Sequence, residues 1–221
     1  MVGAMAIPLR AGDAAILVVE LQNDMVHESR AGQPGLGGSL AAAVERRGVL
    51  PRAAHLLEVA RTCRTPVLYV NVANKPGFPR PRARIYEIAA KRGPLLVEGT
   101  WGAETHPLVA PHPGDHVLLR TCSMDGSYGS GLYAVLRHLR REQVVLLGVS
   151  TTLAVEGLVR ASLNRGFECF VVEDCCAGVP QEWHDWSVAN TLPLMATIAS
   201  AAAVEAALVA TGSGTPDSGQ P

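Results

Sequence analysis

A strand that passes directly into a helix, within residues 143–166, constrains the fold of this chain more than any other feature. Residues 143–149, QVVLLGV, are apolar and largely β-branched, as in a strand that is buried on both faces of a sheet. Residues 150–152, Ser-Thr-Thr, can cap the helix that follows, and Gly166 ends it. The turn between the two elements leaves backbone N–H groups that can hold a carboxylate or a developing oxyanion.

Strands and helices alternate in the same way along the rest of the chain. Apolar runs predict six strands, at 14–21, 66–72, 116–120, 143–149, 168–173 and 195–199. Helical spacing predicts helices at 39–47, 49–63, 131–141 and 180–191, besides the one after 150 and a last one after 199. The alternation predicts a Rossmann-like, three-layer α-β-α fold with a six-stranded, mainly parallel sheet. Segments 22–39, 74–84 and 98–115 are rich in Gly, Pro or polar residues, and we expect irregular loops there, the first a mobile cover.

Composition indicates one globular domain that acts on a small molecule. The chain has 221 residues, of which 48% are hydrophobic and 18% charged. We place the domain at 13–210, after an N-terminal extension at 1–12 and before a disordered tail at 211–221. A net charge of −1, without a basic cluster, argues against nucleic acid and membrane partners. No leader or membrane-spanning run is expected, and the five cysteines suit free thiols, so a cytoplasmic location is predicted.

Three residue groups converge on one edge of the predicted sheet. In such sheets, ligands bind outside the carboxyl ends of the parallel strands. Glu20 ends the first strand, Arg120 ends the third, and the turn at 150–154 follows the fourth. The sequence therefore places a carboxylate, a cation and a helix N-terminus at the same edge.

Several segments of the chain resemble the isochorismatase-like, or cysteine hydrolase, family. GVSTTLAVEG at 148–157 is similar to the family signature G-V-[AS]-T-[NTD]-x-C-V-E, and family-like segments also occur as VVELQND, GTWGAE, PGD and VVEDCCAG. The resemblance extends over nearly all of residues 13–209. It implies that a catalytic aspartate, lysine and cysteine correspond to Glu20, Arg120 and Ala154 in this chain, so that all three positions are substituted.

These substitutions restrict the chemistry that the resemblance implies. A methyl group at Ala154 cannot act as the nucleophile of an amidase. Arg120 keeps the positive charge, and it can hold a carboxylate bidentately but does not release a proton. Glu20 remains an acid, and some family members without the cysteine cleave enol ethers of the isochorismate type by protonating them. Burial would raise the pKa of Glu20 and Arg120 would lower it, and the sequence leaves this balance open.

Two functions stay open at this point. The first is a thiol-independent, acid-catalysed enzyme that acts on a small carboxylate-bearing metabolite, and secondary metabolism is one setting for such a reaction. The second is an inactive homologue that binds a ligand or a partner protein through the same cleft, with a Glu20 to Arg120 ion pair that only closes the sheet edge. The residues expected to contact substrate are Gln22, Trp101, Ser150, Thr151 and Leu153.

Three further expectations concern cofactors, metals and assembly. No cofactor is expected, and neither is a metal site, because residues 70–74 lack the D-x-H type motif of the family's nicotinamidase branch. His184 is expected to be a surface or interface side chain. Self-association to a dimer or tetramer is expected, because the family's domains usually pair and residues 201–210 offer apolar helix surface.

Overall fold

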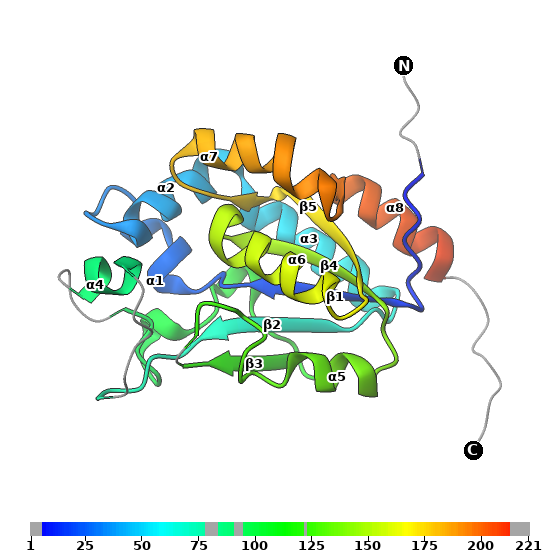
Figure 1. Ribbon diagram of the computed structural model, residues 1–221, viewed down its shortest axis with the longest axis horizontal. Coiled ribbons are helices and arrows are strands. Elements are labelled where there is room, and N and C mark those ends of the chain that lie inside the picture. Colours follow the sequence, from blue (N-terminus) through cyan, green and yellow to red (C-terminus); the bar gives the residue numbers. More distant parts are fainter. Residues whose placement is uncertain (1–5, 78–83, 91–94, 122, 213–221) are drawn as a thin grey trace.

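The computed structural model describes residues 6–77, 84–90, 95–121 and 123–212 (Figure 1). Six strands form one sheet in the order β3-β2-β1-β4-β5-β6, and all neighbouring strands are parallel. The strands are β1 (Ala14–Val19), β2 (Val67–Val72), β3 (His116–Arg120), β4 (Gln143–Val149), β5 (Glu168–Ala177) and β6 (Thr197–Ala199). The predicted three-layer α/β fold with a six-stranded parallel sheet is confirmed.

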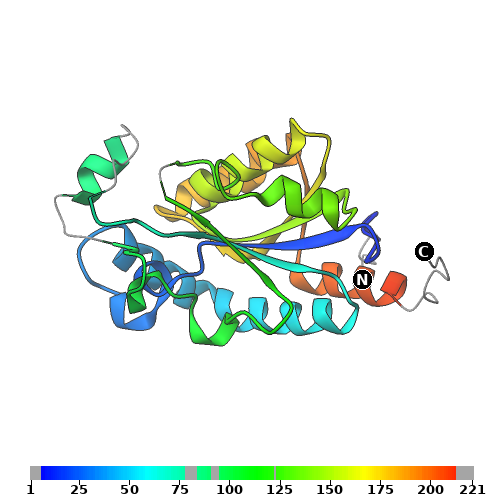
Figure 2. The same cartoon turned by 90° about the horizontal axis from the view of Figure 1, so that it is seen from below.

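Helices cover both faces of the sheet, as Figure 2 shows. The helices are α1 (Asn23–Val26), α2 (Leu36–Arg47), α3 (Val49–Thr62), α4 (Arg84–Ala90), α5 (Leu132–His138), α6 (Glu156–Leu163), α7 (Gln181–Trp186) and α8 (Ala201–Gly212). Apolar residues of α2, α3 and α8 pack on one face, and those of α5 and α6 pack on the other. Ile16 and Val18 of β1 point to the first core, while Ala15 and Leu17 point to the second. A strand covered on both faces is apolar at every position, as the sequence of β1 indicates.

The two ends of the described chain pack against each other beside this core. Leu9 and Ala11 are buried, and the backbone N–H of Ala11 donates to the hydroxyl of Thr211 at 2.8 Å. Helix α8 continues to Gly212, and the rest of the tail predicted at 211–221 lies outside the described residues. No helix of the described part is long and apolar enough to cross a membrane.

The structure differs from the predicted loops in two places. Segment 22–39 was expected to be a mobile cover, but its first part forms α1, whose four residues are all buried. Polar side chains in α1 bind the backbone of a distant loop, which explains how such a polar segment becomes ordered. Helix α4 begins at Arg84, the last residue of the predicted irregular segment 74–84, and runs to Ala90, where no element was predicted.

Candidate active site

Glu20, Arg120 and Ala154 lie together at the carboxyl edge of the sheet. Glu20 directly follows β1, Arg120 ends β3, and Ala154 lies in the first turn after β4. All three line one cavity of about 110 Å³, which we call the inner chamber. Ser150 and Leu153, two of the predicted substrate contacts, line it as well. The three residue groups that were predicted to meet at one sheet edge therefore line a common cavity.

A buried ion pair occupies the floor of the inner chamber. Arg120 Nη2 donates to Glu20 Oε1, and both side chains are at least nine-tenths buried. Arg120 Nη1 donates to the carbonyl of Ser123 and lies 3.5 Å from the hydroxyl of Tyr86 on α4. That hydroxyl also donates to the Ser123 carbonyl at 3.1 Å. Within the described residues, Arg120 Nε is buried and has no hydrogen-bond acceptor, so one donor of the guanidinium is left unsatisfied.

Burial controls the acidity of Glu20. It raises the pKa of the carboxyl, whereas the charge and the hydrogen bond of Arg120 lower it. Burial is the larger effect, so the pKa of Glu20 lies above its ordinary value. Arg120 remains charged, because guanidinium does not deprotonate in proteins. The balance that the sequence left open thus favours a carboxyl that can carry a proton.

The backbone of Glu20 is also unusual. Its φ of 52° lies in the left-handed region, which residues with a side chain adopt at a cost of roughly 1 to 2 kcal/mol. Its N–H donates to the carbonyl of Val70 on the neighbouring strand at 3.2 Å. Strained backbones of this kind cluster at functional sites, where the surrounding structure holds them in place. The left-handed backbone of Glu20 therefore indicates a functional position, at which the surrounding structure compensates for the conformational strain.

The turn after β4 differs from the predicted capped helix. The backbone N–H groups of Leu153, Ala154 and Val155 all donate to the carbonyl of Ser150, at 3.3, 3.0 and 3.1 Å. This makes a π-helical turn over Thr151–Val155, and the Ser150 side chain forms no cap hydrogen bond. These three amides are therefore occupied, which corrects the expectation that they bind an anion. In this turn, the backbone N–H groups of Thr151 and Thr152 are the ones without an acceptor inside the helix.

Thr151 faces away from the inner chamber into a buried polar network. Its hydroxyl lies 2.7 Å from Nδ1 of His184, and Nε2 of His184 lies 3.2 Å from the carboxylate of Glu173. The carboxylate also accepts from Arg47 Nη2. Because Nε2 faces a carboxylate, it carries the proton, and Nδ1 accepts the proton of the Thr151 hydroxyl. His184 is completely buried, so the prediction of a surface or interface side chain is wrong.

Gln22 ties the loop at residues 101–103 to the end of β2, where Val72 lines the inner chamber. Its amide nitrogen donates to the carbonyls of Val72 and Ala103, at 2.7 and 2.6 Å, and its amide oxygen accepts from the N–H of Val72 at 2.8 Å. The adjacent Asn23 donates to the carbonyl of Trp101 at 2.9 Å. Gln22, predicted to contact substrate, does not line the inner chamber and instead holds residues 101–103 against β2.

Trp101 lies in the held loop but outside the inner chamber. Trp101 is 44% exposed, and its ring forms an edge contact with His27, at 4.8 Å between ring centroids. The guanidinium of Arg30 lies 5.7 Å from the same ring. Trp101 was predicted to contact substrate, but it lies on the outer surface of this loop and does not line the inner chamber.

In the described part of the chain, His27, Glu28 and His106 form a group whose spacing could suit a metal ion. Nδ1 of His27 accepts the N–H of Ser29, and Nδ1 of His106 accepts the N–H of Leu108, both at 3.2 Å. A neutral imidazole that accepts at Nδ1 carries its proton on Nε2 and has no lone pair there for a metal. The hydrogen bonding therefore assigns these histidines to capping two short 3₁₀ turns.

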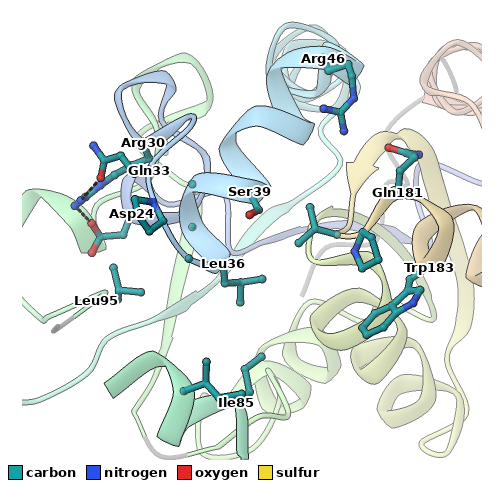
Figure 3. Close-up of a pocket in the computed structure, with 17 residues that line it drawn as sticks. Asp24, Arg30, Gln33, Leu36, Ser39, Arg46, Ile85, Leu95, Gln181 and Trp183 are labelled. Carbon is teal, nitrogen blue, oxygen red and sulfur yellow. Dashed lines mark hydrogen bonds and ion pairs between the residues drawn. The ribbon is translucent and has the colours of Figure 1, made fainter. Parts of the chain in front are cut away.

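A larger cavity of about 690 Å³, which we call the outer basin, adjoins the inner chamber (Figure 3). Leu36, Ile85 and Leu95 line both cavities. Ile85 belongs to α4, the helix that the sequence did not predict, and so does Tyr86 in the inner chamber. Sequence reasoning missed both residues because the segment around α4 is rich in Pro and basic residues.

The fold places a cavity at the carboxyl ends of parallel strands, which is the edge at which α/β proteins of this class bind their ligands. Residues 14–203 match the family described as the isochorismatase domain. The chain therefore belongs to the isochorismatase family. The uncharacterized isochorismatase family protein YecD of Escherichia coli O157:H7 is 26% identical over 192 residues, which cover 87% of this chain and 94% of that protein. Ureidoacrylate amidohydrolase RutB of Agrobacterium fabrum is 25% identical over 181 residues, covering 76% of this chain and 77% of that protein.

Solved structures agree with this assignment. A cysteine hydrolase from Pseudomonas syringae pv. phaseolicola superposes with a TM-score of 0.80, covering 96% of this chain and all of the other, at 16% identity. N-carbamoylsarcosine amidase from Thermoplasma acidophilum superposes with a TM-score of 0.67 at 26% identity, covering 86% of this chain and 96% of its own. The fold of these two proteins thus extends over 96% and 86% of this chain.

Proposed function

We propose that this protein is a thiol-independent enzyme that cleaves a small carboxylate-bearing metabolite by proton transfer from Glu20. The observation that carries the proposal is the buried Glu20 carboxyl, with a raised pKa, beside a permanent positive charge in a cavity. Alanine at position 154 supports a route without a covalent intermediate, since a methyl group there cannot form one.

The proposed roles follow from the polar groups of the inner chamber. The carboxylate of the substrate binds Arg120, which releases Glu20 from its ion pair and lets it hold a proton. For an enol ether, Glu20 donates this proton to the terminal alkene carbon, and water adds to the cationic carbon that results. The proton lost by the water returns to Glu20. The hemiketal then collapses to an alcohol and a ketone, so that atoms and charge balance.

A binding role without catalysis is the second candidate, and one observation favours it. Arg120 already has three partners in Glu20, Ser123 and Tyr86. Such a network is the arrangement expected of a pair that closes the sheet edge. A substrate would have to displace Glu20 from this network before catalysis.

Replacement of Glu20 by Gln separates the two candidates. A general acid replaced by an amide should lose turnover by roughly a hundredfold, with ligand affinity nearly unchanged. The substrates to assay are isochorismate and related enol-ether carboxylates. Asp115→Asn is a matched control, because Asp115 is a mostly buried carboxylate paired with Arg61 at 2.7 Å and does not line the inner chamber. Glu20→Gln should lose about 3 kcal/mol of stability, because the buried charge of Arg120 is left without a carboxylate. Asp115→Asn should lose less, because Arg61 keeps its second carboxylate partner, Glu58, at 2.6 Å.

Only Glu20→Gln should lose turnover. Full turnover in Glu20→Gln, together with the loss of stability, would contradict the general-acid assignment. Ligand binding by the parent protein, without turnover on any enol-ether carboxylate, would support the binding-only candidate.

A further inference from the structure

The outer basin provides far more room than the inner chamber. The inner chamber, at about 110 Å³, holds only a few non-hydrogen atoms beside Glu20 and Arg120. The outer basin, at about 690 Å³, lies within the range of roughly 300 to 1,000 Å³ that is typical of small-molecule sites. The two cavities share three residues of their walls, so one ligand can extend from the first into the second.

The wall of the outer basin is mostly apolar. Large apolar side chains come from four segments of the chain: Leu36, Ile85, Ile88, Leu95, Val179 and Trp183. Figure 3 shows Leu36, Ile85 and Trp183 arranged around the basin, with Asp24 and Arg30 paired to each other at one side and Arg46 at the far rim. The charges of Asp24 and Arg30 in the basin wall thus neutralise each other. The large apolar side chains of the wall then favour a ligand with apolar groups.

Trp183 is the most exposed of these side chains. Its side chain on α7 is 62% exposed, and Ile88 on α4, also in the basin wall, is 48% exposed. Large apolar groups left open in a concave surface mark binding sites, because a ligand that covers them removes apolar area from water. Indole rings contribute especially large contact areas in such sites.

We propose that the ligand of this protein carries a bulky apolar body, aromatic or acyl, which binds in the outer basin against Trp183 while its carboxylate end occupies the inner chamber. The inference rests on the proposed function for the carboxylate end only. It assigns the substrate class: a hydrophobic ether or ester of a small carboxylate, larger than compact amides.

Calorimetry with two carboxylates tests the proposal. The probes are benzoate, which offers Arg120 a carboxylate with a single ring, and biphenyl-4-carboxylate, whose second ring should extend into the outer basin. Biphenyl-4-carboxylate should bind at least about tenfold more tightly, since the second ring buries additional apolar area. Trp183→Ala should remove most of this difference and leave benzoate affinity unchanged. Trp186→Ala is the matched control, because Trp186 is 59% exposed on the same helix but does not line the basin.

The outcomes separate this inference from the proposed function. Equal affinity for both probes, or the same loss in Trp183→Ala and Trp186→Ala, would overturn the apolar-body inference while benzoate binding still supported the carboxylate site. Biphenyl-4-methanol is the neutral probe. Suppose that it binds as tightly as biphenyl-4-carboxylate and that benzoate does not bind. The inference of an apolar site in the outer basin would then be supported, and the proposed carboxylate site at Arg120 would be contradicted. If none of the three probes binds at millimolar concentration, both proposals fail.

Discussion

Gly102 lies so close to Asp24 that a β-carbon at position 102 would overlap the carboxylate of Asp24. Asp24 is buried, accepts the N–H of Leu96 at 2.7 Å and pairs with Arg30. Together with the hydrogen bonds of Gln22 and Asn23, this contact fixes the loop around residues 99–104 against α1. The two family-like segments QND and GTWGAE thus form one structural unit, whose task is to support the wall of the inner chamber.

Gly102→Ala should therefore destabilise the protein by about 2 kcal/mol, because the added methyl group must displace a buried, hydrogen-bonded carboxylate. Gly157→Ala is the control, since Gly157 lies in α6 and a β-carbon there meets nothing within 4 Å. That substitution should stabilise by roughly 0.5 to 1 kcal/mol. Urea denaturation measures both, and a Gly102→Ala variant as stable as Gly157→Ala would contradict the close contact.

Ala154→Cys should not create amidase activity. Among the described residues that line the chamber, the one cation near a new thiol would be Arg120, which cannot take its proton, and the one acid, Glu20, is bound to that arginine. The measurement is hydrolysis of nicotinamide and of ureidoacrylate by the parent and the variant. Turnover of the variant well above that of the parent would show that the thiol is the only missing component.

Acid should destabilise the protein through His184. Burial lowers the pKa of His184, the charge of Arg47 lowers it further, and Glu173 and Asp185 offset this only in part. A histidine whose folded-state pKa is depressed contributes its full stability above its unfolded pKa, about 6.5, and loses it as pH falls through the folded-state value. The melting temperature of the parent should therefore drop as pH falls below about 6.5.

His184→Gln identifies the group that is responsible. The variant should be less stable at pH 7.5, by about 1 to 3 kcal/mol, because Thr151 and Glu173 lose a buried partner. Its melting temperature should then depend less on pH between about 6.5 and 5. His106→Gln is the companion variant, since burial also lowers the pKa of His106. Parallel pH profiles for the parent and His184→Gln would contradict the assignment.

Self-association remains a prediction from the sequence. Within α8, Ala201, Val204 and Leu208 pack into the core, while Val209 is 56% exposed. A dimer or tetramer should be observed by light scattering at micromolar concentration, and Val209→Asp should weaken it because a charge cannot be desolvated cheaply in an apolar contact. A monomeric parent protein would remove this prediction.

Long, uniform apolar runs made the sheet predictable, because a parallel strand buried on both faces tolerates few polar residues. Glu20 and Arg120 were predictable for the same reason, as the polar residues at the ends of such runs. Tyr86 was not, because it lies on α4, a helix that the sequence did not predict. His184 lies on a helix that was predicted, but its role depends on Thr151 and Glu173, which are distant in the chain. The π-helical turn at Thr151–Val155 also has no local signal in the sequence.

The wide separation of the chamber residues along the chain has a consequence during synthesis. Glu20 and Arg120 are 100 positions apart, and Ala154 follows later still. At roughly 5 to 20 residues per second, a ribosome needs on the order of 5 to 20 s to add Arg120 after Glu20. Throughout that interval Glu20 has neither its burial nor its partner. The nascent chain therefore carries an ordinary, solvated glutamate, and the acid acquires its unusual properties only when the third and fourth strands have joined the sheet.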